Sequence, residues 1–490
     1  MMEAVVSVLG RFNALVERGA ALTGLRIDFF KTVSQMVSMI YFSLLFPYIR
    51  SPTAKHVVST MVGILLVLYM YGVKSFLYLL ALPVITYVLI RVGVGRKHPT
   101  VILVFTLLYK SAGAIESLMR CYLCWVIDQT GTAMIISQKC ISSAWDIYDG
   151  LPENGDKVMG RHTQACKIVQ MPTFLEYMGY IFFPPTLVVG PGFEMAYYLN
   201  ACKTKAPSRR FKDALRCYVV APPMLLPYFV KMPWTSEGLL AAEFRQHSLL
   251  YRMMYMHILA WVARFRYYGI WMMAEATIIL SGVGWDGQTW EPVTNLHFFG
   301  CELATNPSRF LENWNVSVQR LIKYYIHTRG PRDEQGHVML WMFYVSFGFS
   351  ALWHGFYPGY YMYFLSFAFL IYSHRQIGHR LAGFAIFQRG PEPRTPARRL
   401  WDGLVWLAKW AYVQLSINYL GAAFLLLSGS QSIAAWHALD WWGHVAWIGF
   451  IPLSMVTAKA LHALGMSWPK PVSPSTVQPS PSDSEQSKTK

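Results

Sequence analysis

Long apolar runs, separated by short polar stretches, recur along the whole 490-residue chain. Only 14% of the residues are charged and 54% are hydrophobic, whereas a soluble protein has about 25% charged residues. Several runs approach the roughly 20 mainly apolar residues that a transmembrane helix needs. The runs lie near residues 32–48, 57–73, 76–92, 101–127, 174–189, 215–230, 249–281, 338–353, 359–373, 402–428 and 445–464. The pattern predicts an all-α, polytopic membrane protein with roughly 11 transmembrane helices.

Prolines interrupt two of these runs, at Phe183-Pro184-Pro185 and at Ala221-Pro222-Pro223. Prolines within a membrane span are tolerated where neighbouring helices satisfy the freed carbonyl groups. We therefore expect broken or re-entrant helices at both places, packed inside the protein.

The chain divides into three predicted parts. Residues 1–30 lack the basic start and long apolar core of a secretory signal, and they resemble an amphipathic helix at the membrane interface. Residues 31–466 form one multi-spanning domain. Residues 467–490 are rich in Ser, Pro and Lys without periodicity, so we expect a disordered tail.

The net charge of +17 has two explanations in a membrane protein. Lys and Arg collect in cytoplasmic loops, which predicts that the basic stretches 203–216 and 389–399 face the cytosol. Basic residues also bind anionic substrates or anionic lipid. No basic domain stands apart from the apolar runs, so nucleic acid is excluded as the expected partner.

The seven cysteines are scattered, and Cys121 with Cys124 forms a lone CxxC pair. No second pair and no nearby histidine completes a zinc site. We therefore predict no metal and no cofactor, and we interpret the cysteines as small buried apolar residues.

The sequence SALWHGFYPGYY, residues 350–361, places a histidine between two apolar runs. A histidine at membrane depth is costly unless it faces a cavity or a partner, so His354 is a functional candidate. Gly355 and Pro358-Gly359 would let backbone or substrate approach closely. A histidine at a helix end that bonds a carbonyl is the alternative, but the surrounding sequence favours function.

The sequence ENWNVSVQR, residues 312–320, is a second place where polar residues lie among apolar ones. It begins a predicted amphipathic helix. The apolar face of this helix carries Trp314, Val318, Leu321 and Tyr325.

Four segments resemble, in the family's order, motifs of the membrane-bound O-acyltransferase family in its lysophospholipid branch. Residues 350–361 resemble the histidine motif, and residues 313–325 (NWNVSVQRLIKYY) resemble the asparagine motif. Residues 264–284 (RFRYYGIWMMAEATIILSGVG) resemble an arginine–aromatic helix motif, and residues 182–194 (FFPPTLVVGPGFE) a proline–glycine segment. The residues Arg309-Phe310-Leu311-Glu312 differ from the Phe-Tyr-x-Asp of the sterol-acylating branch, which disfavours that branch.

This resemblance implies that the family's invariant histidine is His354 and that its partner asparagine is Asn315. The two would face a catalytic chamber inside the helix bundle. Acyl-CoA would enter from the cytosol, and a lysophospholipid would enter laterally from the bilayer. Arg264 and Glu275 match polar positions of the helix motif and are expected to shape the chamber.

Aromatic residues next to the two motifs are the remaining substrate-binding candidates. Their faces attract quaternary ammonium groups, although anchoring at the membrane interface explains the tyrosines equally well. These candidates are Trp314, Trp353, Tyr357, Tyr360 and Tyr361, with Tyr363 in the same cluster.

A histidine and an asparagine together suit direct acyl transfer, which is the simpler mechanism. A neutral imidazole, whose ordinary pKa is about 6.5, can take the proton of an attacking hydroxyl. A carboxamide can stabilise the oxyanion or orient the hydroxyl. A thioester is already activated, and the sequence contains no GxSxG nucleophile motif.

We therefore expect an acyl-CoA-dependent lysophospholipid acyltransferase of the endoplasmic reticulum membrane, with a homo-oligomer left open. It would acylate the free hydroxyl, at sn-2, to give a diacyl phospholipid and CoA. An enzyme of the same family that acylates diacylglycerol, a sterol or a protein is the first alternative. A lipid transporter is the second, but no internal repeat is visible in the sequence.

We expect structural roles for the other charged or titratable residues. His257, His327, His337, His374 and His379 are treated as loop or helix-end residues. Glu116 and Arg120 are four residues apart in an apolar run that also contains Lys110, so we expect them to pair along a helix. The stretch 203–216 could meet the phosphates of CoA, but a solvated loop near anionic lipid is preferred.

Overall fold

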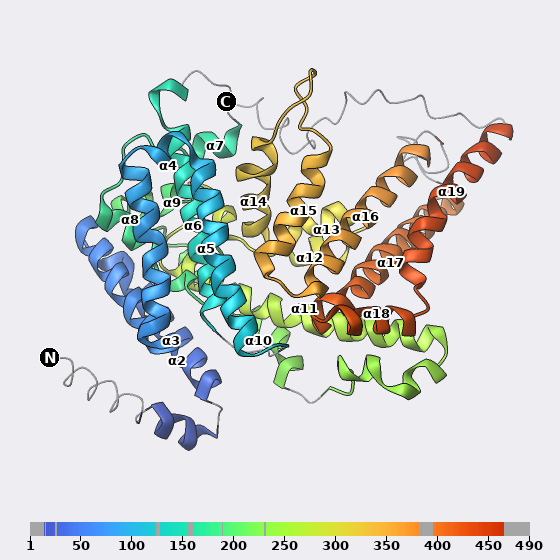
Figure 1. Ribbon diagram of the computed structural model, residues 1–490, viewed down its shortest axis with the longest axis horizontal. Coiled ribbons are helices and arrows are strands. Elements are labelled where there is room, and N and C mark those ends of the chain that lie inside the picture. The colour runs from blue at the N-terminus through green and yellow to red at the C-terminus, as the bar shows by residue number, and fades with distance from the viewer. Residues whose placement is uncertain are drawn as a thin grey trace.

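The computed structural model of the chain is built from helices (Figure 1). It describes residues 14, 16–24, 27–123, 128–154, 160–188, 190–229, 232–381, 384 and 395–464. These residues contain no β-strand, only isolated bridges that pair Leu296 with Trp314 and Arg332 with Val338. The all-α prediction is therefore confirmed. The predicted tail, and much of the predicted interfacial segment, lie outside the described residues.

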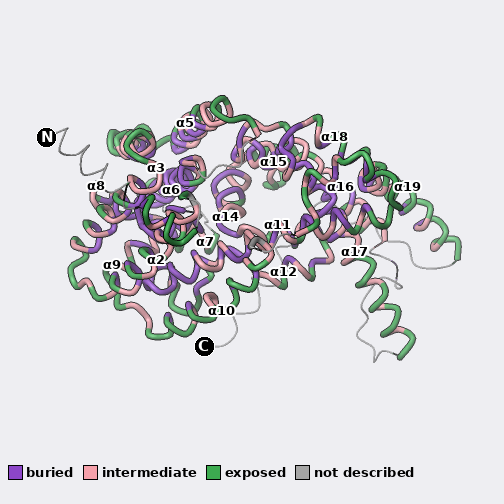
Figure 2. Tube along the Cα trace, turned by 90° about the horizontal axis from the view of Figure 1, so that it is seen from below, coloured by how far each residue is buried: buried purple, intermediate pink, exposed green. Residues whose placement is uncertain are grey.

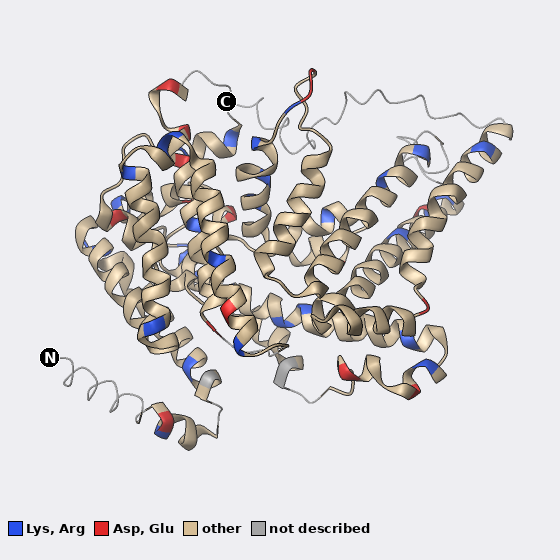
Figure 3. Cartoon of the chain, viewed as in Figure 1, with Lys and Arg blue, Asp and Glu red and all other residues tan. Residues whose placement is uncertain are grey.

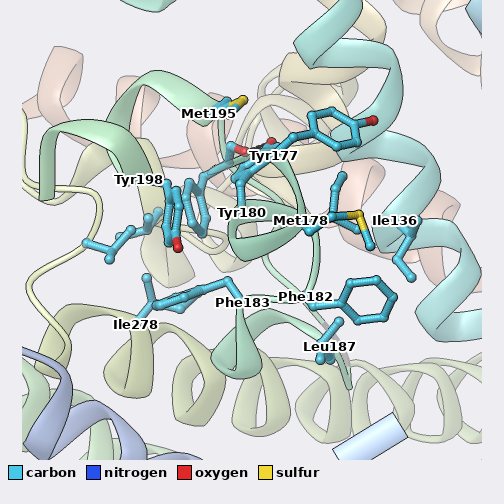
Figure 4. Packing of buried hydrophobic residues seen from close by; sticks show 14 of the residues in the cluster. Ile136, Tyr177, Met178, Tyr180, Phe182, Phe183, Leu187, Met195, Tyr198 and Ile278 are labelled. Carbon is cyan, nitrogen blue, oxygen red and sulfur yellow. Dashed lines mark hydrogen bonds between the residues drawn. The ribbon is translucent and has the colours of Figure 1, made fainter. Parts of the chain in front are cut away.

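Helices of the N-terminal half surround a large apolar core. They are α2 (Ile27–Leu45), η1 (Phe46–Tyr48), α3 (Pro52–Arg91), α4 (Val94–Lys97), α5 (Pro99–Arg120), α6 (Gln129–Asp149), η2 (Pro152–Asn154), α7 (Arg161–Cys166), α8 (Phe174–Ile181), η3 (Pro184–Thr186) and α9 (Met195–Lys203). Figure 4 shows part of this core, where Phe183 and Tyr198 pack with their ring centroids 5.7 Å apart. Ile278 belongs to the same core, so the C-terminal half reaches into it.

Helices of the C-terminal half form a second group, with its own apolar core. They are α10 (Arg210–Phe229), η4 (Glu237–Leu240), η5 (Ala242–Gln246), α11 (Leu249–Leu280), α15 (Trp341–His354), α16 (Pro358–Leu381), α17 (Pro396–Leu426), α18 (Gly429–Ala438) and α19 (Trp442–Ala463).

Short helices and irregular chain fill the space between the two groups. They are η6 (Glu291–Val293), α12 (Phe298–Glu302), α13 (Pro307–Asn313), α14 (Val316–Tyr325) and η7 (His327–Arg329). Figure 1 shows α12, α13 and α14 between α5 and α6 on one side and α16 on the other. The middle of the protein therefore contains backbone N–H and C=O groups that are not hydrogen-bonded within a long helix.

Four helical segments of the described chain are long and apolar enough to cross a membrane. They cover Phe29–Tyr48, Pro52–Arg91, Pro99–Arg120 and Trp442–Ala463. Exposed residues follow the outer helices in Figure 2, and most of the ribbon in Figure 3 is uncharged. Among the exposed side chains are Leu65, Leu108 and Val445, as expected for a surface that faces lipid. The total of about 11 spans stays a prediction.

The proline pair at 184–185 ends a helix, as predicted. Helix α8 stops at Ile181, and Pro184-Pro185 begin a separate 3-10 turn. The fully buried Lys139 donates hydrogen bonds to the carbonyl oxygens of Tyr180 at 2.7 Å and Ile181 at 3.2 Å. An amino group at a helix C-terminus satisfies carbonyl groups that have no partner within the helix. The carbonyl groups that are freed at this break are therefore hydrogen-bonded within the protein.

The prolines at 222–223 do not break a helix, so the second prediction is wrong. Helix α10 continues through Pro222, Pro223 and Pro227. Helix α11 lies very close to it, because a Cβ on Gly269 would be 3.0 Å from the carbonyl oxygen of Ala221. Close packing of a neighbouring helix stabilises a proline-containing helix that would be weak alone.

The cysteines follow the prediction only in part. Cys140, Cys166, Cys202 and Cys301 are buried free thiols. Cys121 is exposed and disulfide-bonded, so its interpretation as a small buried residue is wrong. Cys124 lies outside the described residues.

Gly63 allows α3 to pack closely against the backbone of Phe182. A Cβ at this position would lie 1.9 Å from the carbonyl oxygen of Phe182. Backbone cannot move aside cheaply, so Gly63→Ala should destabilise the protein by about 1–3 kcal/mol. Thermal unfolding of the purified protein in detergent measures this loss.

The control is Gly403→Ala, because Gly403 is exposed in α17 and an added methyl group there would have no atom within 4 Å. Alanine has the higher helix propensity, so this variant should unfold at the wild-type temperature or slightly above it. Equal unfolding temperatures for the two variants would contradict the packing argument.

Candidate active site

His354 is the last residue of α15, and the following glycine ends that helix. Gly355 adopts φ +126°, a conformation that side chains rarely permit. Its N–H donates to the carbonyl oxygens of Ala351 and Leu352, both at 3.2 Å. The Trp-His-Gly sequence therefore places the imidazole at a sharp helix end.

The next turn is fixed by Gly359. Its N–H donates to the carbonyl oxygen of Leu427 at 2.7 Å. A Cβ here would be 2.2 Å from the carbonyl oxygen of Ala423. Only glycine fits, so the start of α16 is held against the end of α17.

Aromatic rings surround the imidazole of His354. Phe364 stacks on it at 5.2 Å between centroids, Phe424 meets it edge-on at 5.2 Å, and Tyr360 lies at 5.4 Å. Among the residues that the structure describes, none forms a hydrogen bond with the ring. Its nitrogens are therefore available to a ligand.

Asn315 precedes α14 in a left-handed conformation, with φ +46° and ψ +55°. Asparagine tolerates this conformation better than most residues. Its carbonyl oxygen accepts the N–H groups of Val318 at 3.0 Å and Gln319 at 3.1 Å, which begins the helix. The carboxamide therefore lies at a defined turn.

A second asparagine, Asn295, holds this turn. Its carbonyl oxygen accepts the N–H of Val316 at 3.0 Å, and its Oδ1 accepts the N–H of Ser317 at 3.1 Å. The N–H of Asn295 itself donates to Oε2 of Glu275 at 3.0 Å. Glu275 therefore positions the asparagine turn from behind, through Asn295.

One cavity of about 130 Å³ brings the two motifs together. His354 and Asn315 both line it, together with Arg264, Trp314 and Trp353. The other lining residues are Ala260, Ala263, Tyr267, Trp271, Phe310, Leu311, Val318, Gln319, Ile322, Ser350, Tyr363, Phe364, Ile417, Asn418, Gly421, Phe424 and Leu425. The cavity is thus mainly apolar, with a few polar groups, as ligand sites usually are.

Four predicted site residues lie outside this lining. They are Glu275, Tyr357, Tyr360 and Tyr361. Tyr360 is buried against the His354 ring, and the hydroxyl of Tyr357 accepts the N–H of Leu123 at 3.1 Å. Tyr361 is half-buried. Tyr363 is the tyrosine of the predicted cluster that lines the cavity.

Arg264 is buried and its charge is paired. Its Nη2 lies 2.9 and 3.0 Å from the two carboxylate oxygens of Glu302, and its Nη1 donates to Asn418. The hydroxyl of Tyr268 donates to the same carboxylate at 2.6 Å. This cluster joins α11, α12 and α17. Sequence patterns did not predict Glu302, Asn418 and Asn295, because each is a lone polar residue without a motif.

The far half of α14 is held by a buried polar cluster. The Tyr325 hydroxyl donates to Asp146 at 2.8 Å, and Arg329 pairs with Asp149. Glu194 lies 3.5 Å from Nε2 of His162 and 3.7 Å from Nε of Arg320. Both ends of α14 are therefore fixed.

Other polar residues lie away from the cavity. Of the described histidines, His354 alone lines it. Arg120 and Glu116 pair at 3.0 Å as predicted, but on the exposed surface, where Lys74 joins them at 2.8 Å. In the stretch 203–216, Arg210 is buried and most other basic side chains are exposed.

The cluster behind α14 makes folding sensitive to acid. Burial lowers the pKa of His162, and the attraction of Glu194 offsets this only in part. The unfolded chain, with a histidine pKa of about 6.5, then binds a proton that the folded protein does not. Stability contributed by neutral His162 is therefore present above pH 6.5 and lost as the pH falls below about 6.5.

His162→Gln removes the group that binds this proton when the protein unfolds. The unfolding temperature of the variant should fall less than that of the wild type between about pH 7.5 and about pH 5.5. His379→Gln, at an exposed position of α16, should keep the wild-type dependence. If His162→Gln follows the wild-type curve, His162 is not the group responsible.

These features define a class of protein: an all-helical membrane protein with a histidine and an asparagine in one internal cavity. Comparison with known families agrees with this class. The pattern of the MBOAT, or membrane-bound O-acyltransferase, family matches residues 65–422, which include both residues. The chain belongs to the membrane-bound O-acyltransferase family and is an integral membrane protein.

Several characterised proteins are similar to the chain. Lysophospholipid acyltransferase 1 of Arabidopsis thaliana is 27% identical over 67% of this chain and 72% of its own length. Lysophospholipid acyltransferase 2 of the same plant is 26% identical over 93% of this chain and 97% of its own length. The lysophospholipid acyltransferase of Schizosaccharomyces pombe is 29% identical over 65% of each chain.

Proposed function

We propose that the protein is an acyl-CoA-dependent lysophospholipid acyltransferase of the endoplasmic reticulum membrane. It transfers a fatty acyl group to the free sn-2 hydroxyl of a lysophospholipid and releases CoA. The observation that carries this proposal is the common cavity of His354 and Asn315 in a chain of this family. The names of its relatives support a lysophospholipid as the acceptor.

His354 acts as the general base. Its imidazole takes the proton from the acceptor hydroxyl while the hydroxyl oxygen attacks the thioester carbonyl carbon. The carbon–sulfur bond then breaks, and the proton passes from the imidazolium to the CoA thiolate. The aromatic rings around His354 exclude water, which would otherwise hydrolyse the thioester.

Asn315 stabilises the oxyanion that forms on the thioester carbonyl, or orients the attacking hydroxyl. Its Nδ2 group is a donor, and its Oδ1 accepts a long bond of 3.4 Å from Ser317. A preorganised donor of this kind lowers the barrier without reorganising during the reaction.

Acyl transfer is direct, without an acyl-enzyme. Ser350 is the only hydroxyl of a serine or threonine among the described lining residues. It donates to the carbonyl oxygen of Ser346 at 3.0 Å and so is not activated by a base. No described cysteine lines the cavity.

His354→Ala should reduce acyl transfer by about 10²–10⁴-fold, because the general base is removed. The assay follows transfer of a labelled acyl group from acyl-CoA to lysophosphatidylcholine by purified protein. His379→Ala, at an exposed position of α16, is the matched control and should remain active. Near-normal turnover of a folded His354→Ala protein would end this mechanism.

Asn315→Gly removes the carboxamide but suits the left-handed backbone. It should lower kcat by about 10²–10³-fold without lowering the unfolding temperature. Asn315→Asp keeps the size and the acceptor oxygen of the side chain but loses the N–H donor. It should therefore be as inactive as Asn315→Gly. Full activity of the aspartate variant would show that donation to an oxyanion is not required.

A further inference from the structure

The buried guanidinium of Arg210 has no anionic partner among the residues that the structure describes. Arg210 is the first residue of α10 and is only 7% exposed. Its Nη1 donates to the carbonyl oxygen of Pro207 at 3.3 Å, and its buried Nε has no hydrogen-bond partner in the described chain. An arginine stays charged in proteins, and a buried charge is normally paired. The guanidinium can therefore bind an anion that the chain itself does not provide.

The one acidic residue of the stretch 203–216 serves a different arginine. Asp213 lies 2.7 Å from Nε of Arg209 and accepts Nε1 of Trp290 at 2.8 Å. Several basic side chains around Arg210 in the sequence are exposed, namely Arg50, Lys203, Lys205, Lys212 and Arg216. This part of the surface therefore has an excess of positive charge.

Two aromatic rings relate Arg210 to the boundary of the membrane. The guanidinium carbon lies 5.9 Å from the ring centroid of Tyr48 and 4.2 Å from that of Phe211. Tyr48 is the last residue of the candidate membrane span Phe29–Tyr48, and the next candidate span begins at Pro52. Tyrosine is enriched at the membrane interface, where the head groups lie. Arg210 is therefore at the depth expected for lipid phosphates.

Helix α10 leaves this boundary alongside α2. Ile40 of α2 and Tyr218 of α10 line one small crevice. Ile40 lies eight residues before Tyr48, and Tyr218 lies eight residues after Arg210, which is about 12 Å along a helix in each case. The two helices therefore run side by side from the boundary toward the middle of the membrane.

Exposed apolar side chains cover both helices on this side of the boundary. Phe211, Leu215 and Val219 are exposed, and they follow one another at intervals of four residues, so they lie on one face of α10. Leu45 is exposed near the end of α2. Such a surface suits the acyl chains of a phospholipid, whereas a water-soluble phosphate compound gains little from it.

We propose that Arg210 binds the phosphate of a phospholipid from the surrounding bilayer, and that it selects head groups with a net negative charge. The planar guanidinium matches phosphate oxygens in pairs, and basic pockets at membrane helices bind anionic head groups. The rings of Tyr48 and Phe211 are 68% and 45% exposed, so each can turn to let a phosphate reach the guanidinium.

The exposed basic residues nearby disfavour the free cation of a zwitterionic head group, so phosphatidic acid should bind better than phosphatidylcholine. Arg210 does not line the cavity that contains His354 and Asn315. The bound phospholipid is therefore separate from the substrates, and this inference does not depend on the proposed function.

The test measures the unfolding temperature of the full chain in neutral detergent with dioleoyl phosphatidic acid or dioleoyl phosphatidylcholine. A ligand that binds only the folded protein raises this temperature. Phosphatidic acid should raise it further than phosphatidylcholine, and Arg210→Gln should lose the difference without unfolding earlier in phosphatidylcholine. Native mass spectrometry should show the Kd for phosphatidic acid raised about tenfold in Arg210→Gln.

Lys212→Gln is the matched control, because it removes the same charge from an exposed position of the same helix. It should keep the Kd within about twofold of the wild type. Arg210→Lys keeps the charge without the planar fork and serves if Arg210→Gln does not fold; its Kd should rise about threefold. Equal losses in Arg210→Gln and Lys212→Gln, or a wild-type Kd in Arg210→Lys, would overturn the Arg210 site.

Soluble phosphates separate a lipid from other sources of phosphate. Millimolar CoA or inorganic phosphate should leave the effect of phosphatidic acid on the wild type unchanged. Loss of the effect with CoA would assign Arg210 to the phosphates of CoA, and the same rise with inorganic phosphate alone would assign it to any phosphate. Either result, or equal unfolding temperatures in the two phospholipids, would show that Arg210 does not select an anionic phospholipid.

Discussion

The position of Asn315 depends on one carboxylate that the cavity does not contain. Glu275 accepts the backbone N–H of Asn295, and Asn295 in turn bonds the first two N–H groups of α14. In a membrane protein, irregular backbone must find its partners inside the protein, because lipid offers none. Short helices and irregular chain join α11 to α14, and a carboxyl group fixed in a long helix accepts the hydrogen bond that holds this part of the chain.

The same constraint governs the buried polar side chains. The amino group of Lys139 satisfies carbonyl groups at the broken end of α8. Arg264, which lines the cavity, is neutralised by Glu302. A buried charge without a partner costs several kcal/mol, roughly 3–5 when one member of a pair is removed. The cavity therefore presents little net charge, which suits an uncharged thioester and a fatty acyl chain.

Sequence reasoning predicted the helices because they depend on local apolar patterns, and the resemblance to the family pointed to His354 and Asn315, which line one cavity in the structure. Apolar runs specify helices, Gly355 ends α15, and Asn315 precedes the first residue of α14. The partners of these residues could not be predicted in the same way: Asn295, Glu302 and Asn418 are single polar residues that meet the site only after folding. Local sequence also gave a wrong expectation at Pro222-Pro223, where packing against Gly269 keeps α10 continuous.

The motif Arg264-Phe265-Arg266 gives two neighbouring arginines different environments through helix geometry alone. Successive residues of an α-helix are rotated by about 100° about its axis. Two residues that are two positions apart therefore lie on nearly opposite faces. Arg264 accordingly points into the core and pairs with Glu302, while Arg266 lines a second cavity of about 350 Å³. Ala263 of α11 and Leu425 of α17 line both cavities. One helix thus forms a wall of the mainly apolar cavity that contains His354 and Asn315 and of the second cavity beside it.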